Sequence, residues 1–284
     1  MRGSTFARTA ATVLLLFLAG CQGSLGSHPS NPGQPAGRQA APSIYLIVLE
    51  NHGATVLEQA PFLRGLASRY AIATNYHAVA HPSLPNYLAL TSGSTWGVED
   101  NDYHALPAAD IGSQMTAAKL RWRAYMEGMG SDCQTDTDQY VVKHDPFAFY
   151  GGRCAPAVVP LDGLDGDLAR ATYAFTWITP DLCHDMHDCD VEEGDTWLAA
   201  TVPAILASPG WLHGGVLYIT FDEDDESSAT DNLVPLVVVS SKLKAHNARA
   251  RYDHYSLLAT IEDALGLPRI GKAAQAAPIS GLLG

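Results

Sequence analysis

Two apolar segments of this chain end directly in clusters of oxygen-bearing side chains. Residues 43–49 (SIYLIVL) are followed by 50–52 (ENH), and residues 215–221 (GVLYITF) by 222–225 (DEDD). Apolar runs of this length are typical of strands that are buried on both faces. Open α/β sheets bind ligands beyond the carboxyl ends of such strands, where carboxylate and amide oxygens suit a divalent cation. The two segments predict a metal site assembled from distant parts of the chain, although acidic loops also occur without a metal.

The rest of the chain alternates strands with helices. Helices are expected over 60–70, 87–90, 111–118, 196–207 and 256–265, and further strands over 122–126, 173–178 and 233–239. This alternation predicts an α/β fold with a mainly parallel central sheet and helices on both faces. The chain has 284 residues, of which 47% are hydrophobic, and this is enough for one such domain.

The first 42 residues have the composition of a targeting segment and a linker. A charged start and the apolar stretch 10–18 form an export signal that is too short to cross a membrane comfortably. It ends in Leu18-Ala19-Gly20-Cys21, which resembles a bacterial lipobox, where the cysteine receives lipid. We predict a lipoprotein signal peptide over 1–20 and a flexible tether over 21–42, which anchors the protein to the bacterial cell membrane outside the cytoplasm. An ordinary signal peptide with an incidental cysteine is the alternative.

Four cysteines remain after Cys21: Cys133, Cys154, Cys183 and Cys189. An even number in an exported chain suggests two disulfides. Sequence order and short loops favour the pairs Cys133–Cys154 and Cys183–Cys189, although four cysteines allow three pairings. A zinc site is the alternative, but no C-x-x-C pair is present. The net charge of −13 argues against a nucleic-acid partner.

The segment 81–87 (HPSLPNY) places a serine between two prolines. The prolines restrict the backbone around Ser83, and the helix that follows would bring its positive amino-terminal end near the hydroxyl. A hydroxyl held beside a metal can act as a nucleophile, and Asn86 could donate a hydrogen bond to a developing oxyanion. In the alternative interpretation Ser83 only caps a helix and Asn86 lies on the surface.

Six motifs in a fixed order resemble the bacterial phosphoesterase family of acid phosphatases and phospholipases C, in the alkaline-phosphatase-like superfamily. They are 50–52 (ENH), 81–87 with Gly93, 143–146 (KHDP), 185–188 (DMHD), 221–225 (FDEDD) and 252–256 (YDHYS). The similarity looks nearest to the secreted acid phosphatases of mycobacteria and extends from about residue 43 to about 268. It implies that residues 43–284 form a phosphoesterase catalytic domain with an alkaline-phosphatase-like fold.

The resemblance also implies roles for particular residues. One divalent ion (calcium, magnesium, manganese or iron) would be held by Glu50, Asn51, Ser83, Asp222 and Glu223, with Ser83 also the nucleophile and Asn86 on the phosphate. The rest of the site would be lined by His81, His144, Asp185, His187 and His254. Two-metal superfamily members hold a second ion at positions like Asp181, Asp185 and His254. Because this family generally has one metal, Asp185, His187 and His254 are assigned to phosphate binding or leaving-group protonation.

These observations predict a metal-dependent acid phosphatase that hydrolyses small phosphate monoesters through a phosphoserine intermediate. Phosphoinositide headgroups are among the candidate substrates. A phospholipase C-type phosphodiesterase and a catalytically inactive surface-binding lipoprotein are the alternatives. Neither the natural substrate nor the oligomeric state follows from the sequence.

Overall fold

The computed structural model describes residues 42–170, 173–225, 231–243 and 246–279. The predicted signal peptide, Cys21 and the tether up to residue 41 lie outside these residues. In the described part of the chain, no helix is both long and apolar enough to cross a membrane.

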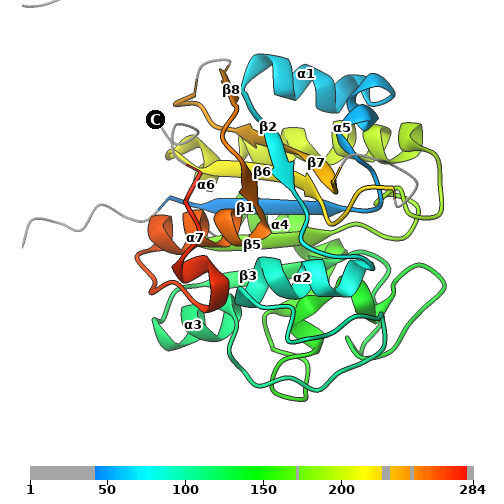
Figure 1. The fold of residues 1–284 in the computed structure, drawn as a ribbon, viewed down its shortest axis with the longest axis vertical. Coiled ribbons are helices and arrows are strands. Elements are labelled where there is room, and N and C mark those ends of the chain that lie inside the picture. Colours follow the sequence, from blue (N-terminus) through cyan, green and yellow to red (C-terminus); the bar gives the residue numbers. More distant parts are fainter. Residues whose placement is uncertain (1–41, 171–172, 226–230, 244–245, 280–284) are drawn as a thin grey trace, which may run out of the picture. The chain divides into compact units, whose positions relative to one another are not determined.

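A single sheet forms the centre of the domain (Figure 1). Its strands are β1 (Ile44–Leu49), β2 (Ala71–His77), β3 (Trp122–Met126), β4 (Val158–Pro160), β5 (Phe175–Thr179), β6 (Val216–Phe221), β7 (Leu233–Val239), β8 (His246–Ala248) and β9 (Tyr252–Asp253). The spatial order is β4-β3-β5-β1-β6-β7-β2-β8, and β9 also pairs with β2. Only β7 runs against its neighbours among the described strands, so the predicted mainly parallel sheet is confirmed.

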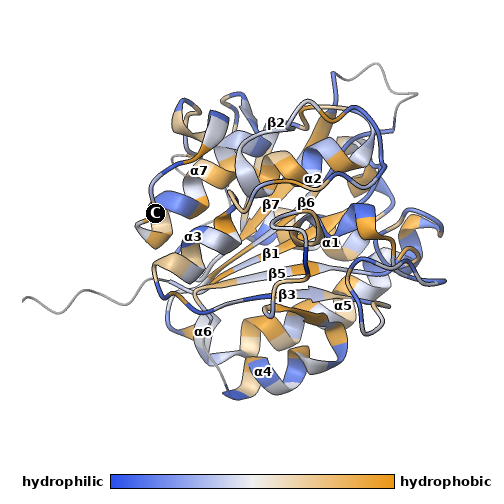
Figure 2. Ribbon diagram, turned by 90° about the horizontal axis from the view of Figure 1, so that it is seen from below, coloured by the Kyte–Doolittle hydropathy of each residue, from blue (hydrophilic) through white to orange (hydrophobic). Residues whose placement is uncertain are grey.

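Helices cover both faces of this sheet, as predicted (Figures 1 and 2). They are α1 (Pro61–Arg69), α2 (Ser83–Ser92), α3 (Ile111–Ala117), α4 (Leu164–Arg170), α5 (Val191–Ala207), α6 (Pro209–Leu212) and α7 (His254–Leu265). Short 3-10 turns are η1 (Ala54–Glu58), η2 (Val142–His144), η3 (Pro146–Ala148), η4 (Leu161–Gly163) and η5 (Gly271–Ala274). One face carries α2, α3 and α7, the other carries α4, α5 and α6, and α1 packs against α5 and β7.

The core follows from the hydrophobic runs in the sequence. All six residues of β1 are buried, as are all six of β6, because each strand has a neighbour on both sides and helices above and below. Figure 2 shows hydrophobic colours concentrated on the central strands, whereas the helices carry hydrophilic residues as well. A buried carboxylate joins two surface elements: Asp195 of α5 accepts the backbone N–H groups of Phe62 and Leu63 in the first turn of α1, at 2.8 and 2.9 Å. This contact caps α1 and fixes it to α5.

Several boundaries differ from the sequence predictions. Helix α2 begins at Ser83 rather than Tyr87, because Pro85 lies in its first turn, where no intrahelical N–H is needed. Helix α5 begins at Val191, five residues before the predicted start, and α7 begins at His254 instead of Ser256. Strand β5 starts at Phe175 and extends to Thr179. The elements β2, β4, β8, β9, α4 and α6 were not predicted, since most are short or mix polar and apolar residues.

The sheet topology brings distant loops to one edge. Leu49 of β1 is paired with Phe221 of β6 in parallel register, so the next residues, Glu50 and Asp222, are neighbours. The carboxyl ends of β2 and β5 meet the same edge, and β7, being antiparallel, starts there. The predicted crevice beyond the strand ends is therefore the place where the motif residues gather.

Candidate active site

Ser83 is the first residue of α2 and only 2% of it is exposed. Its Oγ donates to Glu50 Oε2 at 3.1 Å and lies 3.3 Å from Glu223 Oε1, so its one hydrogen is held between two carboxylates. Every residue of α2 is buried, and the helix ends at Gly93 with a φ of 68°. A Cβ at Gly93 would lie 2.4 Å from the carbonyl oxygen of Ile270, so glycine is needed there for both conformation and space. The helix that begins at Ser83 is thus packed along its whole length.

Asn86 lies one turn further along α2. Its side-chain amide forms most of its hydrogen bonds with the turn that precedes the helix. Its Oδ1 accepts the N–H groups of Val79 and Ala80, both at 3.0 Å, and its Nδ2 donates to Ala80 O at 2.9 Å. The same Nδ2 lies 3.3 Å from Glu223 Oε2. Asn86 therefore faces the predicted metal ligands, while it also shapes the segment that leads into Ser83.

Glu50 and Glu223, the two carboxylates at the hydroxyl, interact with a third buried carboxylate, Asp222. Asn51 has a φ of 57°, and its backbone N–H donates to Asp222 Oδ1 at 3.1 Å. Asp222 Oδ2 is buried and has no hydrogen-bond partner. Burial, together with the charges of Glu50 and Glu223, raises the pKa of Asp222 well above its usual range. A divalent cation would relieve this charge accumulation, so the donor set fits the predicted metal.

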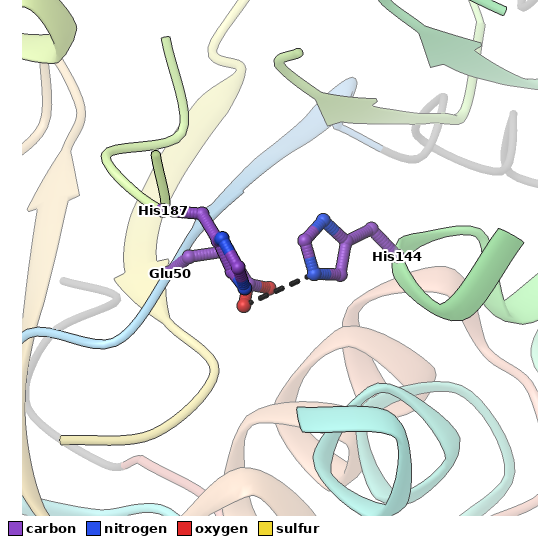
Figure 3. A group of neighbouring side chains, drawn as sticks. All are labelled: Glu50, His144 and His187. Carbon is purple, nitrogen blue, oxygen red and sulfur yellow. Dashed lines mark ion pairs between the residues drawn. The ribbon is translucent and has the colours of Figure 1, made fainter. Parts of the chain in front are cut away.

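A second group of potential ligands shares Glu50, because its carboxylate and ring nitrogens of His144 and His187 lie within 4.8 Å of one another (Figure 3). These rings already have partners. His144 Nε2 lies 3.1 Å from Glu50 Oε2, without hydrogen-bond geometry, and Nδ1 lies 3.2 Å from Asp185 Oδ2. His187 Nδ1 lies 2.6 Å from Asp188 Oδ1, and Nε2 lies 3.1 Å from Lys143 Nζ. Asp222 Oδ2, His144 Nε2 and Asp185 Oδ2 are all buried without a hydrogen-bond partner, so the preference for the carboxylate group rests on its hard oxygen ligands, which suit a divalent cation.

The side of the site formed by His144 is positively charged. Burial lowers the pKa of His144, but Glu50 and Asp185 outweigh burial and raise it to about 9. Burial likewise disfavours the charged form of Glu50, yet His144 and Lys143 outweigh it, so the pKa of Glu50 is lowered. His144 and Lys143 thus bring positive charge to Glu50, the residue that accepts the Ser83 hydrogen bond.

His81 lies at the opening of the site. Its Nδ1 is 2.9 Å from Glu223 Oε2, its Nε2 is 3.4 Å from Asp224 Oδ1, and 32% of its side chain is exposed. It is therefore placed to contact a substrate and a predicted metal ligand at the same time.

Sequence reasoning did not single out Tyr87, although it belongs to the same motif as Ser83. Its hydroxyl donates to Glu50 Oε1, and its ring stacks on His144 at a centroid distance of 5.5 Å. Because Tyr87 follows Ser83 by four residues, both project from one side of α2. That helical spacing was the available signal.

His254 and Asp185 lie behind the site. Both are fully buried. His254 Nε2 lies 2.6 Å from the carbonyl oxygen of Asp222, and Nδ1 lies 2.8 Å from the Tyr76 hydroxyl, so both ring nitrogens are engaged. Asp185 contacts His144 through Oδ2 and accepts the His187 N–H at 2.8 Å through Oδ1. These contacts differ from the expected role in phosphate binding or protonation, and they suit residues that position Asp222, His144 and His187.

The alternative second-metal set is not assembled among the described residues. Asp181 directs Oδ1 to the N–H groups of Cys183 and His184, at 3.1 and 2.9 Å, and Oδ2 to Gln139. It thus organises the start of the loop that carries Asp185, separate from Asp185 and His254 themselves.

Both predicted disulfides are confirmed: Cys133–Cys154, with Cα atoms 5.7 Å apart, and Cys183–Cys189, with Cα atoms 4.7 Å apart. The second closes the loop that carries Asp185 and His187. The zinc alternative is excluded, because the four cysteines are consumed in pairs. Disulfides of this kind are typical of proteins that fold outside the cytoplasm.

Comparison with known proteins defines the class of this site. A sequence model of the Phosphoesterase family matches residues 53–268. The chain therefore belongs to the Phosphoesterase family and is a phosphoric ester hydrolase.

Individual relatives are consistent with this assignment. The chain is 30% identical over 253 residues to a phosphatidylinositol-3-phosphatase of Mycobacterium tuberculosis, covering 85% of this chain and 82% of that protein. It is 26% identical over 230 residues to an acid phosphatase of Aspergillus fumigatus, covering 74% of this chain and 52%, about half, of the fungal protein.

Solved structures agree on the fold. A protein of the alkaline phosphatase superfamily from Vibrio parahaemolyticus superposes with a TM-score of 0.60 at 12% identity, covering 86% of this chain and 72% of that chain. A phosphonate monoester hydrolase from Silicibacter pomeroyi gives a TM-score of 0.56 at 10% identity, covering 85% and 76%. The predicted alkaline-phosphatase-like fold is confirmed.

Proposed function

We propose that this protein is a metal-dependent phosphomonoesterase that works through a phosphoserine on Ser83. The observation that carries the proposal is the buried Ser83 hydroxyl held between Glu50 and Glu223, two carboxylates that also interact with Asp222, whose Oδ2 has no hydrogen-bond partner. A serine with a purely structural role is rarely found in a group of carboxylates. A cation shared between the serine oxygen and the carboxylates would explain this position. The names of the relatives, a phosphatidylinositol-3-phosphatase and acid phosphatases, support the same class of reaction.

The metal would be held by Glu50, Asn51, Asp222 and Glu223 together with the Ser83 oxygen. These are hard oxygen ligands, suited to calcium, magnesium, manganese or iron(II). When bound, the ion supplies charge neutralisation and lowers the pKa of the serine hydroxyl. It also removes the repulsion among the three carboxylates.

The first chemical step transfers the phosphoryl group to Ser83. The Ser83 oxygen forms a bond to phosphorus, its proton passes to Glu50 Oε2, towards which it already points, and the bond from phosphorus to the leaving oxygen breaks. Lys143 and His187, 3.1 Å apart, form a pair that can supply a proton to the leaving alkoxide.

In the second step water attacks the phosphoserine. The bond from phosphorus to the Ser83 oxygen breaks as the water oxygen bonds to phosphorus. One water proton passes to the Lys143–His187 pair and replaces the proton given to the leaving alkoxide, while Ser83 takes back its proton from Glu50, so that phosphate is released and the starting state is restored. His81 at the opening would hold a non-bridging oxygen in both steps, while the charge of the buried His144 would stabilise the anion from the inner side. A monoester dianion uses this positive charge more fully than a diester does.

Phosphorylated headgroups, such as those of phosphoinositides, are candidate substrates for this chemistry. We further propose that the protein is held at the outer face of the bacterial membrane by lipid on Cys21. Such an anchor would keep the enzyme close to its own membrane and to exported phosphate esters.

The test compares p-nitrophenyl phosphate with bis-p-nitrophenyl phosphate, with and without chelator. We expect faster hydrolysis of the monoester at or below neutral pH, loss of activity in chelator and recovery with one divalent ion. Ser83→Ala should lower kcat by about three orders of magnitude or more. Thr91→Ala on the same helix is the matched control, because its hydroxyl bonds within α2 and to Tyr150, away from the carboxylates.

Two results would contradict the proposal. Full activity in metal-free protein would show that the reaction does not need a metal. A mild effect of Ser83→Ala would show that another residue is the nucleophile. Faster cleavage of the diester would replace the monoesterase by a phospholipase C-type phosphodiesterase, and inactivity towards both esters with every divalent ion would favour a binding protein.

A further inference from the structure

The first turn of α2 does not cap its own N–H groups in the usual way. Its N-cap position is occupied by Pro82, whose side chain has no acceptor and makes no capping hydrogen bond. Pro85 in the same turn has no N–H at all. The N–H of Leu84, directly after Ser83, is accepted instead by Oδ1 of Asn101 at 3.0 Å. The cap therefore comes from a loop residue 17 positions further along the chain.

This hydrogen bond acts on the backbone of Ser83. The peptide unit between Ser83 and Leu84 is planar, so an acceptor that fixes the Leu84 N–H also restrains the plane to which the Ser83 Cα is attached. Ser83 Oγ has little freedom, because it is held between two carboxylates at 3.1 and 3.3 Å. Asn86 organises the turn before Ser83, and Asn101 holds the chain directly after it. The serine is thus fixed from both sides.

Asn101 lies in a turn whose neighbours hold it in shape. Asp100 Oδ1 accepts the Asp102 N–H at 3.0 Å, which closes the chain around Asn101. Tyr103 stacks on the buried Phe149, with ring centroids 5.2 Å apart. Phe149 belongs to the segment that the disulfide between residues 133 and 154 closes. The cap on α2 is therefore supported by a cross-linked part of the domain.

The side chain of Asn101 is neutral, although both of its neighbours in the sequence are aspartates. An aspartate here would also accept the Leu84 N–H, and the positive end of the helix would favour it. Covalent geometry keeps Ser83 Oγ within about 5 Å of the Leu84 nitrogen, so Asn101 Oδ1 lies within about 8 Å of that oxygen. A neutral amide therefore holds the start of the helix without placing a negative charge beside an anionic substrate.

We propose that Asn101 is a positioning residue for phosphoryl transfer: its Oδ1 caps α2 at Leu84 and so holds Ser83 in place for attack, and its neutrality avoids repulsion of the phosphoryl group. This inference rests on the proposed function, because it concerns the reaction of Ser83. Asn101 acts through the backbone of Ser83 and does not itself contact the substrate.

The experiment compares Asn101→Ala and Asn101→Asp with the wild type on p-nitrophenyl phosphate, in the divalent ion that gives the highest activity. Asn101→Ala removes the cap. Because a misplacement of about 1 Å lowers a rate by about 100-fold, kcat should fall by about that factor, while KM changes by less than about twofold. Tm should fall by only about 2–4 °C. Hydrogen exchange of the Leu84 amide should become about fivefold faster, which is a readout besides activity.

Asn101→Asp keeps the acceptor but adds a charge. Its Tm and the exchange of the Leu84 amide should stay near the wild-type values. One charge about 8 Å from a phosphoryl dianion, in surroundings close to water, should lower kcat/KM by about sixfold at low salt. This loss should nearly disappear in about 0.5 M salt, where screening is strong. Aspartate thus restores at high salt what alanine loses, whereas a merely structural residue would affect activity only in proportion to the lost stability.

Asp110→Ala is the matched control, since Asp110 lies at the end of the same loop and caps α3 by accepting the Ser113 N–H at 3.1 Å. It should lower Tm by a similar amount and leave kcat within about twofold of the wild-type value. If Asp110→Ala and Asn101→Ala lower kcat equally, the general order of the loop is what matters, and the inference is overturned.

The failure of this inference is distinguishable from that of the proposed function. A wild-type kcat in Asn101→Ala, or a loss in Asn101→Asp that persists at high salt, would overturn the role of Asn101 while the phosphomonoesterase stands. If the wild type hydrolyses no phosphate ester with any divalent ion, both proposals are overturned.

Discussion

Asp222→Asn should change the stability of the metal-free and metal-bound protein in opposite directions. Asp222 accepts the Asn51 N–H through Oδ1, and an asparagine oxygen can keep this bond. Its Oδ2 is buried without a partner, next to Glu50 on the adjacent strand. The substitution therefore removes one buried charge from a crowded group while leaving shape and backbone contact nearly unchanged.

The magnitude follows from the sheet geometry. Neighbouring strands lie about 4.8 Å apart, and two like charges about 5 Å apart repel by about 3 kcal/mol at an effective dielectric constant of about 20. Glu223 adds repulsion and His144 offsets part of it, so we expect a gain of about 3 kcal/mol in the free energy of unfolding without metal. For a domain of this size that corresponds to a rise of about 6–12 °C in Tm.

Metal should reverse the effect, because the variant loses a charged ligand. Wild-type Tm should rise with increasing manganese or calcium concentration by the linkage of binding to folding, while the Tm of Asp222→Asn should respond weakly. Thermal unfolding of both proteins in chelator and across a metal titration gives the comparison directly.

Asp195→Asn is the control for a buried carboxylate outside the site. Asp195 caps α1 through two backbone N–H groups, so its substitution should lower Tm by a similar amount with and without metal. If Asp222→Asn also lowers Tm in chelator, the carboxylates do not repel one another as argued, and the electrostatic case for the cation is lost.

Three further predictions concern other parts of the molecule. Burial raises the pKa of Glu262 to about 8 from 4.5, so its contribution to stability is full below pH 4.5 and is lost as pH rises through 8. Glu262→Gln should flatten this decline of the free energy of unfolding, measured with urea between pH 5 and 8. Parallel pH curves for the variant and the wild type would contradict the prediction. Replacing both Cys183 and Cys189 by serine should lower kcat at least about tenfold, while Tm falls by only about 5–10 °C. The reason is that the disulfide closes a short loop, which holds His187 in place but removes little entropy from the unfolded chain. An unchanged kcat would show that the loop keeps its shape without the disulfide. Cys21→Ala should move the protein from the membrane fraction to the soluble fraction, and mass spectrometry that finds no lipid on Cys21 of the wild type would remove the anchor.

The sequence was informative wherever burial dominates. Strands β1, β6 and β7 are continuous apolar runs with neighbours on both sides, so local composition is sufficient to predict them. Strand β2 mixes buried and exposed positions and contains a bulge between Ala73 and Tyr76, which breaks the simple alternation. The antiparallel direction of β7 could have been expected, because only the 11 residues 222–232 separate it from β6 and a parallel crossover needs a dozen or more.

For the site, residue types were easier to predict than their orientation. The chain motifs brought Glu50, Ser83 and Glu223 together as expected, because strand ends and a helix start converge at one sheet edge. His254 has the chemistry of a catalytic residue, but its ring lies under the Asp222 backbone, a result of β9 pairing with β2. How deeply a side chain such as His254 is buried depends on which strands pair with one another, and a motif of five residues does not contain that information.

The order of the strands in the sheet has a consequence for synthesis. The contact between Asn51 and Asp222 spans 171 residues, and that between Ser83 and Glu223 spans 140. Strand β1 is flanked by β5 and β6, both of which follow it by more than half of the domain, so in a growing chain β1 has no partner until β5 has emerged and keeps one open edge until β6 follows. Fragments that stop between β5 and β6 should lack the site and carry one aggregation-prone open edge on β1. The candidate site can therefore form only after β6 has emerged, so hydrolytic activity should report that β6 has joined the sheet.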